Sequence, residues 1–352
     1  MHTEHHPADD DAARRTARHR SGSRPHRRML AVLAPLAALA VGAALLLAPA
    51  ASQAAARVAP GKVTGDVLVH DPSMVRGPDG TYLLAATAPG IALRTSVDRT
   101  AFTYRGVAFP GGAPWTDAWT GTSNGNLWAP DLSYRNGQYY LYYAASSFGS
   151  NKSAIFLATS PTGLPGTWTH RGLVYSTTTS SDHNAIDPSL YVADDGRWWL
   201  TFGSFWTGLK QLELDPATGL RRGTSLRSVA ARPGSTALEA PAVIKHGSSF
   251  YLFMSWDRCC QGAASTYRIM VGRATSVGGP YLDRNGVALT QGGGTQVLAS
   301  SGRYVGPGGQ SVLADADGEL LVYHYYDAQD GGRAKLGVNL LGWDTAGWPY
   351  VR

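Results

Sequence analysis

The sequence predicts an all-β protein, a five-bladed β-propeller, and three observations carry the prediction. After residue 57, amphipathic helical periodicity is scarce, whereas short apolar or aromatic runs alternate with Gly, Asp, Asn and Pro. A phrase made of a polar head, a short strand, a glycine turn and an apolar strand recurs five times. Its turn glycines are spaced by 57, 59, 51 and 71 residues, which suits blades of about four strands. These glycines are Gly80, Gly137, Gly196, Gly247 and Gly318. A β-sandwich, the alternative fold, does not explain five such heads at one period.

The N-terminal segment 1–56 is expected to be an export signal ahead of a single catalytic propeller domain over 57–352. An apolar stretch from Met29 to Leu47 follows an Arg-rich start and precedes small residues with Ala-x-Ala-like cleavage sites. An uncleaved membrane anchor is the alternative, but the alanines and the small-residue boundary favour cleavage. The pair Arg27-Arg28 loosely resembles a twin-arginine signal. We therefore expect a secreted, extracellular protein.

The charge of the chain argues against nucleic acid as a partner. The whole chain has a net charge of +6, but the export segment holds seven basic and four acidic residues, so the remainder carries only +3. No basic stripe remains after residue 56. We expect no nucleic-acid partner, no stable membrane partner after signal cleavage, and a monomer.

The two cysteines of the chain, Cys259 and Cys260, are adjacent and therefore cannot staple distant loops together. In an oxidising compartment they could form a vicinal disulfide. Two free thiols in a tight turn are the alternative, and the sequence leaves both open.

The polar heads of the five phrases point to a shared site. In a propeller the innermost strand of each blade lines the central channel, so the strand starts open at one mouth. An Asp-Pro pair at a strand start is ordinary turn chemistry, but here four of the five heads, each on a different blade, are acids. Inverting glycosidases need one carboxylate to activate water and a protonated acid set apart from it. The sequence thus predicts such an enzyme. The heads are Asp71, Asp131, Asp187, Glu239 and Gln310.

Nine motifs then occur in an order that resembles a known family. They are VHDPSMV, LWAPD, SSFGSNKSAI, NAIDPSL, FGSFWTGLKQ, EAPAVI, SWDRCCQG, VGRATSVGGPYLD and QGGGT. The chain is similar to the propeller glycosidases of glycoside hydrolase family 43, in particular the endo-acting α-1,5-L-arabinanases, over nearly all of residues 66–350. The resemblance implies a five-bladed propeller that cleaves internal α-1,5-L-arabinofuranosidic bonds of arabinan, a pectin side chain, by inversion. It implies no organic cofactor.

The resemblance also implies roles for three carboxylates. Asp71 would be the general base that activates water, Glu239 the general acid, and Asp187 the group that raises the pKa of Glu239 and orients it. The chemistry agrees, because two carboxylates in one low-dielectric site repel each other and one of them stays protonated. Asp71 must stay ionised, so hydrogen-bond donors should surround it. Asp131 has no catalytic role in the family, and we expect it to bond backbone amides.

Further positions match substrate contacts of the family. Asn184, Ala185 and Ile186 would line the subsite of the cleaved arabinose together with Asp187. The other candidates are His70 beside the base, Trp128, Gly149, and the trio Ser204, Phe205 and Trp206. Each has a plainer alternative: a hydrogen-bonded core histidine for His70, a core tryptophan for Trp128 and a turn glycine for Gly149.

His324, in VYHYYD, matches a histidine that binds a metal ion in the central channel of the family, usually calcium with a water shell. Calcium prefers oxygen ligands, so waters would have to complete the site. A channel histidine bonded to backbone or solvent is the alternative. The sequence departs from the family at Gly309, where many members carry a second histidine.

Three other functions fit the same motifs. An exo-acting α-L-arabinofuranosidase or a β-xylosidase would keep the fold and the acids but close one end of the groove, and residues 110–127 are the expected wall. A non-catalytic sugar-binding propeller would keep the aromatic residues and lose an acid. All three acids are present.

Overall fold

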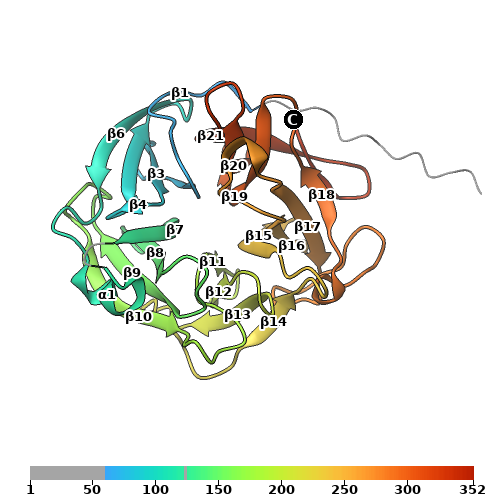
Figure 1. The fold of residues 1–352 in the computed structure, drawn as a ribbon, viewed down its shortest axis with the longest axis horizontal. Coiled ribbons are helices and arrows are strands. Elements are labelled where there is room, and N and C mark those ends of the chain that lie inside the picture. Colours follow the sequence, from blue (N-terminus) through green and yellow to red (C-terminus); the bar gives the residue numbers. More distant parts are fainter. Residues whose placement is uncertain (1–59, 123–124) are drawn as a thin grey trace, which may run out of the picture. The chain divides into compact units, whose positions relative to one another are not determined.

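The computed structural model describes residues 60–122 and 125–352, which form five sheets arranged as blades around a central channel (Figure 1). This arrangement confirms the predicted five-bladed β-propeller. The expected export segment lies outside the described residues. Within the described part of the chain, no helix combines the length and apolar character needed to cross a bilayer.

The first two sheets have five strands each. Blade 1 holds β1 (Thr64–Gly65), β2 (Ser73–Arg76), β3 (Tyr82–Ala86), β5 (Ala92–Ser96) and β6 (Ala101–Val107). Blade 2 holds β4 (Ala88–Pro89), β7 (Asn126–Arg135), β8 (Gln138–Ser146), β9 (Ser153–Ser160) and β10 (Thr169–Ser176). Two short helices, η1 (Pro114–Thr116) and α1 (Asp117–Thr120), lie between β6 and β7 along the chain.

The remaining three sheets have four strands each. Blade 3 holds β11 (Ser189–Val192), β12 (Trp198–Phe202), β13 (Leu209–Leu214) and β14 (Arg227–Ala230). Blade 4 holds β15 (Leu238–His246), β16 (Ser249–Trp256), β17 (Arg268–Ala274) and β18 (Thr295–Leu298), with the 3-10 helices η2 (Gly262–Ala264) and η3 (Leu289–Gln291). Blade 5 holds β19 (Tyr304–Asp315), β20 (Gly318–Asp327), β21 (Arg333–Trp343) and β22 (Pro349–Val351).

The five turn glycines lie where the sequence predicts them, at the turn that joins the innermost strand of each blade to its antiparallel neighbour, with Gly318 as the first residue of β20. All five have positive φ, from 58° at Gly247 to 133° at Gly318. Glycine adopts such angles without the strain that a β-carbon would add, so it fits these tight turns. The repeated phrase is therefore the inner hairpin of each blade.

Apolar clusters hold neighbouring blades together. In one of them, Met74 and Leu84 of blade 1 are buried with Leu320, Val322 and Leu336 of blade 5, so the last blade packs on the first. Backbone bonds close the same seam: the Leu336 amide donates to the Val67 carbonyl, and Leu68 pairs with Lys335. The N-terminal strand segment thus ties the ends of the ring together.

The heads of the five blades share one backbone conformation, but the residues that adopt it are not the five that the sequence predicts. A residue with left-handed φ lies just before the inner strands β2 and β11 and at a register shift within the inner strands β7, β15 and β19. These residues are Asp71, Ala129, Asp187, Ala240 and Gly309, with φ of 48°, 42°, 54°, 53° and 57°. Proline follows the first four. The expected equivalence of Asp131, Glu239 and Gln310 is therefore wrong, since Asp131 lies two residues beyond this position, Glu239 one before and Gln310 one after.

Candidate active site

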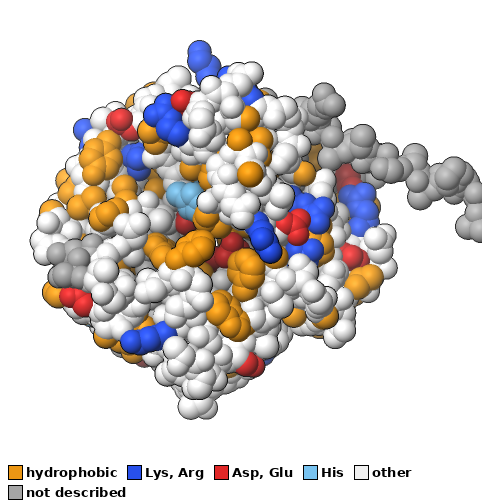
Figure 2. Space-filling model, in the orientation of Figure 1, with side chains coloured by type: hydrophobic (Ala, Val, Ile, Leu, Met, Phe, Trp, Pro, Cys, Tyr) orange, Lys and Arg blue, Asp and Glu red, His pale blue; other side chains and the backbone are white. Residues whose placement is uncertain are grey.

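A channel runs along the ring axis of the described residues. It encloses about 480 Å³ and is lined by the inner segments of all five blades. Figure 2 shows a central depression on one face, with acidic and histidine side chains inside and apolar side chains around it. Asp71, Asp187, Ala240 and Gly309 lie in the channel wall, so the left-handed heads bring two of the three predicted acids to one place.

Asp71 lies among hydrogen-bond donors. His70 Nδ1 is 2.8 Å from Asp71 Oδ2, and the Thr87 hydroxyl donates to the same oxygen at 2.7 Å. Burial would raise the pKa of Asp71, but the charge and hydrogen bond of His70, with smaller contributions from His324 and Thr87, outweigh it and lower the pKa to about 2. Asp71 is thus ionised at neutral pH, as expected of a base.

Glu239, in β15, has the opposite environment. Its side chain is buried, the Tyr267 hydroxyl donates to Oε1, and the Ser204 hydroxyl also donates to the carboxyl. Burial raises the pKa of Glu239 to about 7, and the charge of Asp71 adds to the rise, whereas the Tyr267 hydrogen bond opposes it. A substantial fraction of this carboxyl therefore carries a proton at neutral pH.

Asp187 is coupled to Glu239 through space and through the backbone. Burial raises the pKa of Asp187 well above its usual value, and the charges of Glu239 and Asp71 raise it further. Its Oδ2 accepts the amide N–H of Ala240, the residue after Glu239, at 3.0 Å. The two acids therefore titrate as a pair that retains a proton, and Asp187 fixes the backbone that carries Glu239. Burial, rather than Asp187, is the largest cause of the raised Glu239 pKa.

Asp131 joins blades 2 and 3. Its Oδ2 accepts the Leu190 amide at 2.9 Å, which agrees with the expected bond to backbone. The same kind of bond recurs between blades 1 and 2, where Ser73 Oγ accepts the Leu132 amide at 2.9 Å. Burial raises the pKa of Asp131 to about 7 because this one amide offsets only part of the desolvation.

The NAID segment supports the site more than it lines it. Asn184 is buried and makes two bonds to Ser204, donating from Nδ2 to Oγ at 2.9 Å and accepting its amide at 2.8 Å. Ala185 has no exposed surface and packs in the core beside Tyr140 and Leu200, so its expected place in a substrate subsite is wrong in this structure. Ile186 is also buried, and its carbonyl accepts the Gly203 amide.

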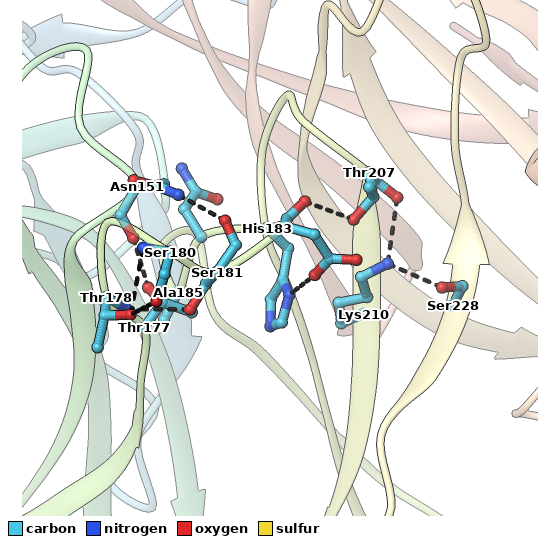
Figure 3. A network of polar contacts seen from close by, with 12 residues as sticks. Asn151, Thr177, Thr178, Ser180, Ser181, His183, Ala185, Thr207, Lys210 and Ser228 are labelled. Carbon is cyan, nitrogen blue, oxygen red and sulfur yellow. Dashed lines mark hydrogen bonds and ion pairs between the residues drawn. The ribbon is translucent and has the colours of Figure 1, made fainter. Parts of the chain in front are cut away.

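A polar network holds the loop ahead of Asn184 (Figure 3). The buried Lys210 donates to Thr207 O and to Ser228 Oγ at 2.8 Å, and Thr207 Oγ1 donates to Asp182 O at 2.7 Å. On the other side, Asn151 Nδ2 donates to Ser181 O at 2.6 Å. The loop before Asn184 is thus tied to the loop after Trp206, which keeps Asn184 opposite Ser204.

The aromatic candidates differ in exposure. Phe205 and Trp206 have left-handed φ of 46° and 37°, an uncommon conformation for bulky residues, and Trp206 is 38% exposed. Trp128 is half-buried in β7 beside a β-bulge. Gly149 has φ of 77° with open space around it, which fits a turn glycine. Its neighbour Phe148 is 85% exposed, and the sequence analysis did not single it out.

His70 and His324 lie stacked, with ring centroids 3.9 Å apart. Both nitrogens of His70 have protein partners, since Nδ1 faces Asp71 and Nε2 is 2.8 Å from the Tyr326 hydroxyl. His70 can therefore meet substrate only with the rest of its ring, and its side chain is 26% exposed. His324 Nδ1 accepts the Asp71 amide, and its buried Nε2 has no hydrogen-bond partner among the described residues.

Gly309 allows this close packing. A β-carbon there would lie 2.5 Å from Asp71 Oδ1 and 2.7 Å from His324 Cε1. Any side chain at position 309 would therefore collide with the two groups. Position 309, where the sequence departs from the family, is thus one at which Asp71 and His324 leave no room for a side chain.

Three residues of the site were missed by the sequence analysis: Thr87 and Tyr326 on the Asp71 side, and Tyr267 on the Glu239 side. Thr87 follows a buried strand and Tyr267 precedes one, so nothing in the sequence distinguishes either residue from an ordinary strand end. Only the folded chain brings these hydroxyls to the carboxyls. The segment 110–127, the expected wall, carries Trp115 and Trp119, which pack on the core of blade 2, and residues 123 and 124 lie outside the described part.

An ionised carboxyl and a buried, proton-bearing carboxyl pair in the channel of a five-bladed propeller define a propeller glycosidase. Residues 61–349 match the family of glycosyl hydrolases 43, and the chain belongs to that family. An extracellular endo-α-(1→5)-L-arabinanase of Bacillus subtilis is 43% identical over 80% of this chain and 87% of its own. An extracellular exo-α-(1→5)-L-arabinofuranosidase of Cellvibrio japonicus is 38% identical, with 80% and 86% covered. The structure of an endo-arabinanase from Bacillus licheniformis superposes with a TM-score of 0.78 at 42% identity, covering 82% of this chain and 99% of its own.

Proposed function

We propose that this protein is a secreted endo-acting arabinanase that hydrolyses internal α-1,5-L-arabinofuranosidic bonds of arabinan with inversion. The single observation that carries the proposal is the opposed protonation of Asp71, in the channel wall, and Glu239, the residue before Ala240 of the same wall. Family membership supplies the substrate class, because the relatives of the chain are named for arabinan and its arabinofuranosyl bonds. The two named enzymes are both described as extracellular, which supports secretion.

The residues divide the reaction as follows. Asp71, ionised and held by His70 and Thr87, removes a proton from the attacking water. Glu239 gives its proton to the leaving oxygen, and Asp187 keeps the Glu239 backbone in place through the Ala240 amide. A water between base and sugar is what inversion requires.

The test is the hydrolysis of debranched arabinan followed by NMR with time. The proposal predicts a mixture of oligosaccharides as early products, with the first-formed reducing end inverted at the anomeric carbon. A first product with retained configuration would contradict the mechanism. The same time course decides the second candidate, an exo-acting enzyme, which the exo-acting relative at 38% identity favours. Arabinose or one short oligosaccharide of fixed length as the sole early product would establish exo action.

We further propose that exposed aromatic side chains near the mouth bind the sugar chain. Trp206 follows the Ser204 that bonds Glu239, and Phe148 lies on the loop with Gly149. Aromatic faces stack on apolar faces of sugars. Phe148→Ala should raise KM for arabinan several-fold with kcat little changed, whereas Tyr350→Phe, on an outer strand, should change neither. An unchanged KM in Phe148→Ala would remove Phe148 from the binding surface.

We also propose that a calcium ion binds at His324 Nε2, with waters as its other ligands. The support is that Nε2 is buried without a hydrogen-bond partner among the described residues, beside the channel. The ion would add positive charge near Asp71. Ligation at Nε2 would move the imidazole proton to Nδ1, so the ion would replace the hydrogen bond from the Asp71 amide with a contact toward Asp71 Oδ1, 3.6 Å away. Elemental analysis should find one calcium per chain that His324→Ala loses, and a chelator should lower Tm. A protein without calcium whose Tm ignores the chelator would contradict this proposal.

A further inference from the structure

The two cysteines form a disulfide at the edge of the site. This settles the alternatives that the sequence left open. They lie in the connection between β16 and β17, where Cys259 is half-buried and Cys260 is exposed. The disulfide closes a ring with the peptide bond between the two residues, so it restricts the backbone at Cys260, whose φ is 66°.

A chain of hydrogen bonds runs from this backbone to the proposed base. The Cys260 amide donates to the Tyr326 hydroxyl at 2.7 Å, and that hydroxyl is 2.8 Å from His70 Nε2. His70 Nδ1 in turn is 2.8 Å from Asp71 Oδ2. An amide N–H can only donate, so Tyr326 accepts from Cys260 and can still bond Nε2, either by donating its own proton to neutral His70 or by accepting the Nε2 proton of charged His70. In both forms His70 carries a proton on Nδ1, where it donates to the Asp71 carboxylate.

The sulfur contacts the same imidazole. Cys260 Sγ is 3.8 Å from His70 Nε2, so the disulfide packs against the ring that Tyr326 bonds. The loop around the disulfide is itself braced: the Arg258 amide donates to Thr266 Oγ1 at 3.2 Å, and the Gln261 amide donates to Ser265 Oγ at 3.0 Å. The position of His70 is thus set from one side by a covalently constrained turn.

We infer that the Cys259–Cys260 disulfide and Tyr326 are positioning groups for the catalytic base: they orient His70, which orients Asp71. The inference rests on the proposed role of Asp71. None of these groups needs to touch the sugar. Loss of the chain should therefore lower kcat and leave KM nearly unchanged, because a base out of line weakens the chemical step more than substrate binding.

The first test uses reduction, because the chain has no cysteine other than this pair. Dithiothreitol adds two electrons and two protons to the bond, giving two thiols, and is itself oxidised to its cyclic disulfide. After complete reduction, confirmed by titration of two thiols, kcat on debranched arabinan should fall roughly 10- to 100-fold with KM within a factor of two. The Cys259→Ser/Cys260→Ser variant should have the low kcat from the start and should not respond to dithiothreitol.

The second test uses Tyr326→Phe, with Tyr325→Phe on the same strand as the matched control. Tyr326→Phe should lower kcat to a similar degree, and adding the serine pair to it should lower kcat little further, because both changes break one chain. Tyr325→Phe should leave kcat unchanged. Tm is measured for every variant, so that a loss of folded protein is not read as a loss of kcat.

The results of these experiments decide whether the disulfide and Tyr326 position the base. Wild-type kcat that survives complete reduction, or a Tyr326→Phe effect that adds fully to the serine pair, overturns the positioning role. Asp71→Asn separates this failure from failure of the proposed function. If Asp71→Asn is inactive while the reduced enzyme keeps its kcat, the base stands and the positioning inference falls. If Asp71→Asn is active, the base assignment itself falls.

Discussion

The Asp71 and Glu239 side chains are both largely buried, yet the pKa values of their carboxyls are displaced in opposite directions. On the Asp71 side, His70 and Thr87 supply donors and positive charge, and the pKa falls to about 2. On the Glu239 side, two hydroxyl donors do not offset burial, and the pKa rises to about 7. The comparison teaches that burial alone does not assign an acid or a base, and that the neighbouring donors and charges decide it.

The largest expected effect comes from removing the ionised side. Asp71→Ala should lower kcat on arabinan by on the order of 10³-fold, because the other two acids of the site, Asp187 and Glu239, have raised pKa values and neither can replace the ionised base. Initial rates measure it. The control is Asp79→Asn, an exposed turn acid of the same blade, which should retain full activity. If the kcat of Asp71→Ala lay within tenfold of the wild-type value, Asp71 would not be the base.

Asp187→Asn tests the coupling within the buried pair. The amide oxygen can still accept the Ala240 N–H, but one charge is gone, so ionised Glu239 is less repelled and its pKa falls. Because the acid must be protonated, the alkaline limb of kcat/KM should move below its wild-type position near pH 7. At pH 7 the activity should drop about 10- to 100-fold.

The pH profile checks this prediction, with Asp195→Asn, an exposed acid of the same blade, as control. An alkaline limb that stays in place would mean that Asp187 acts on Glu239 only through the backbone. A limb that moves upward would contradict the coupling.

Tyr267→Phe should move the same limb in the opposite direction. The hydroxyl donates to Glu239 and lowers its pKa, so its removal raises the pKa and extends the protonated form to higher pH. Activity at pH 7 should change less than tenfold. Tyr281→Phe is the matched control, because that buried tyrosine donates to the Val277 carbonyl instead of a carboxyl. A downward shift in Tyr267→Phe would refute the proposed direction of the hydrogen bond.

The smallest effect on kcat is expected at Thr87, whose hydroxyl bonds both Asp71 and the backbone of blade 2. Its hydroxyl donates to Asp71 and accepts the Ala129 amide at 2.8 Å. Thr87→Val leaves that amide unpaired and should lower the free energy of unfolding by about 1–3 kcal/mol, with a few-fold loss of kcat. Thr87→Ser keeps the hydroxyl and should restore most of both. Denaturant unfolding measures the difference, and equal stability of the two variants would contradict it.

The sequence predicted the ring because its signals are local. Each turn glycine has a positive φ, and an Asp-Pro or Ala-Pro pair marks four of the five blade heads, so the frame could be read without tertiary contacts. The prolines after Asp71, Ala129, Asp187 and Ala240 mark equivalent positions in four blades, whereas the acids do not. By this criterion Asp131 lies outside the set of equivalent residues.

The surroundings of the acids could not be read in the same way. Tyr267 reaches Glu239 from 28 residues away, and Tyr326 reaches His70 from 256 residues away. No spacing in the sequence links such pairs, because the folding of blade 4 brings the first pair together and closure of the ring brings the second. For the same reason, the sequence could suggest NAID as substrate contacts but could not show that Ala185 faces the core.

The most direct test of the opposed roles is to compare Glu239→Gln and Asp71→Asn on arabinan and on an arabinotrioside with a dinitrophenyl leaving group. A good leaving group needs no proton, so Glu239→Gln should lose on the order of 10³-fold on arabinan but remain near wild type on the activated substrate. Asp71→Asn should be impaired on both, because water still has to be deprotonated. Equal losses of Glu239→Gln on the two substrates, or recovery of Asp71→Asn on the activated one, would contradict the assignment.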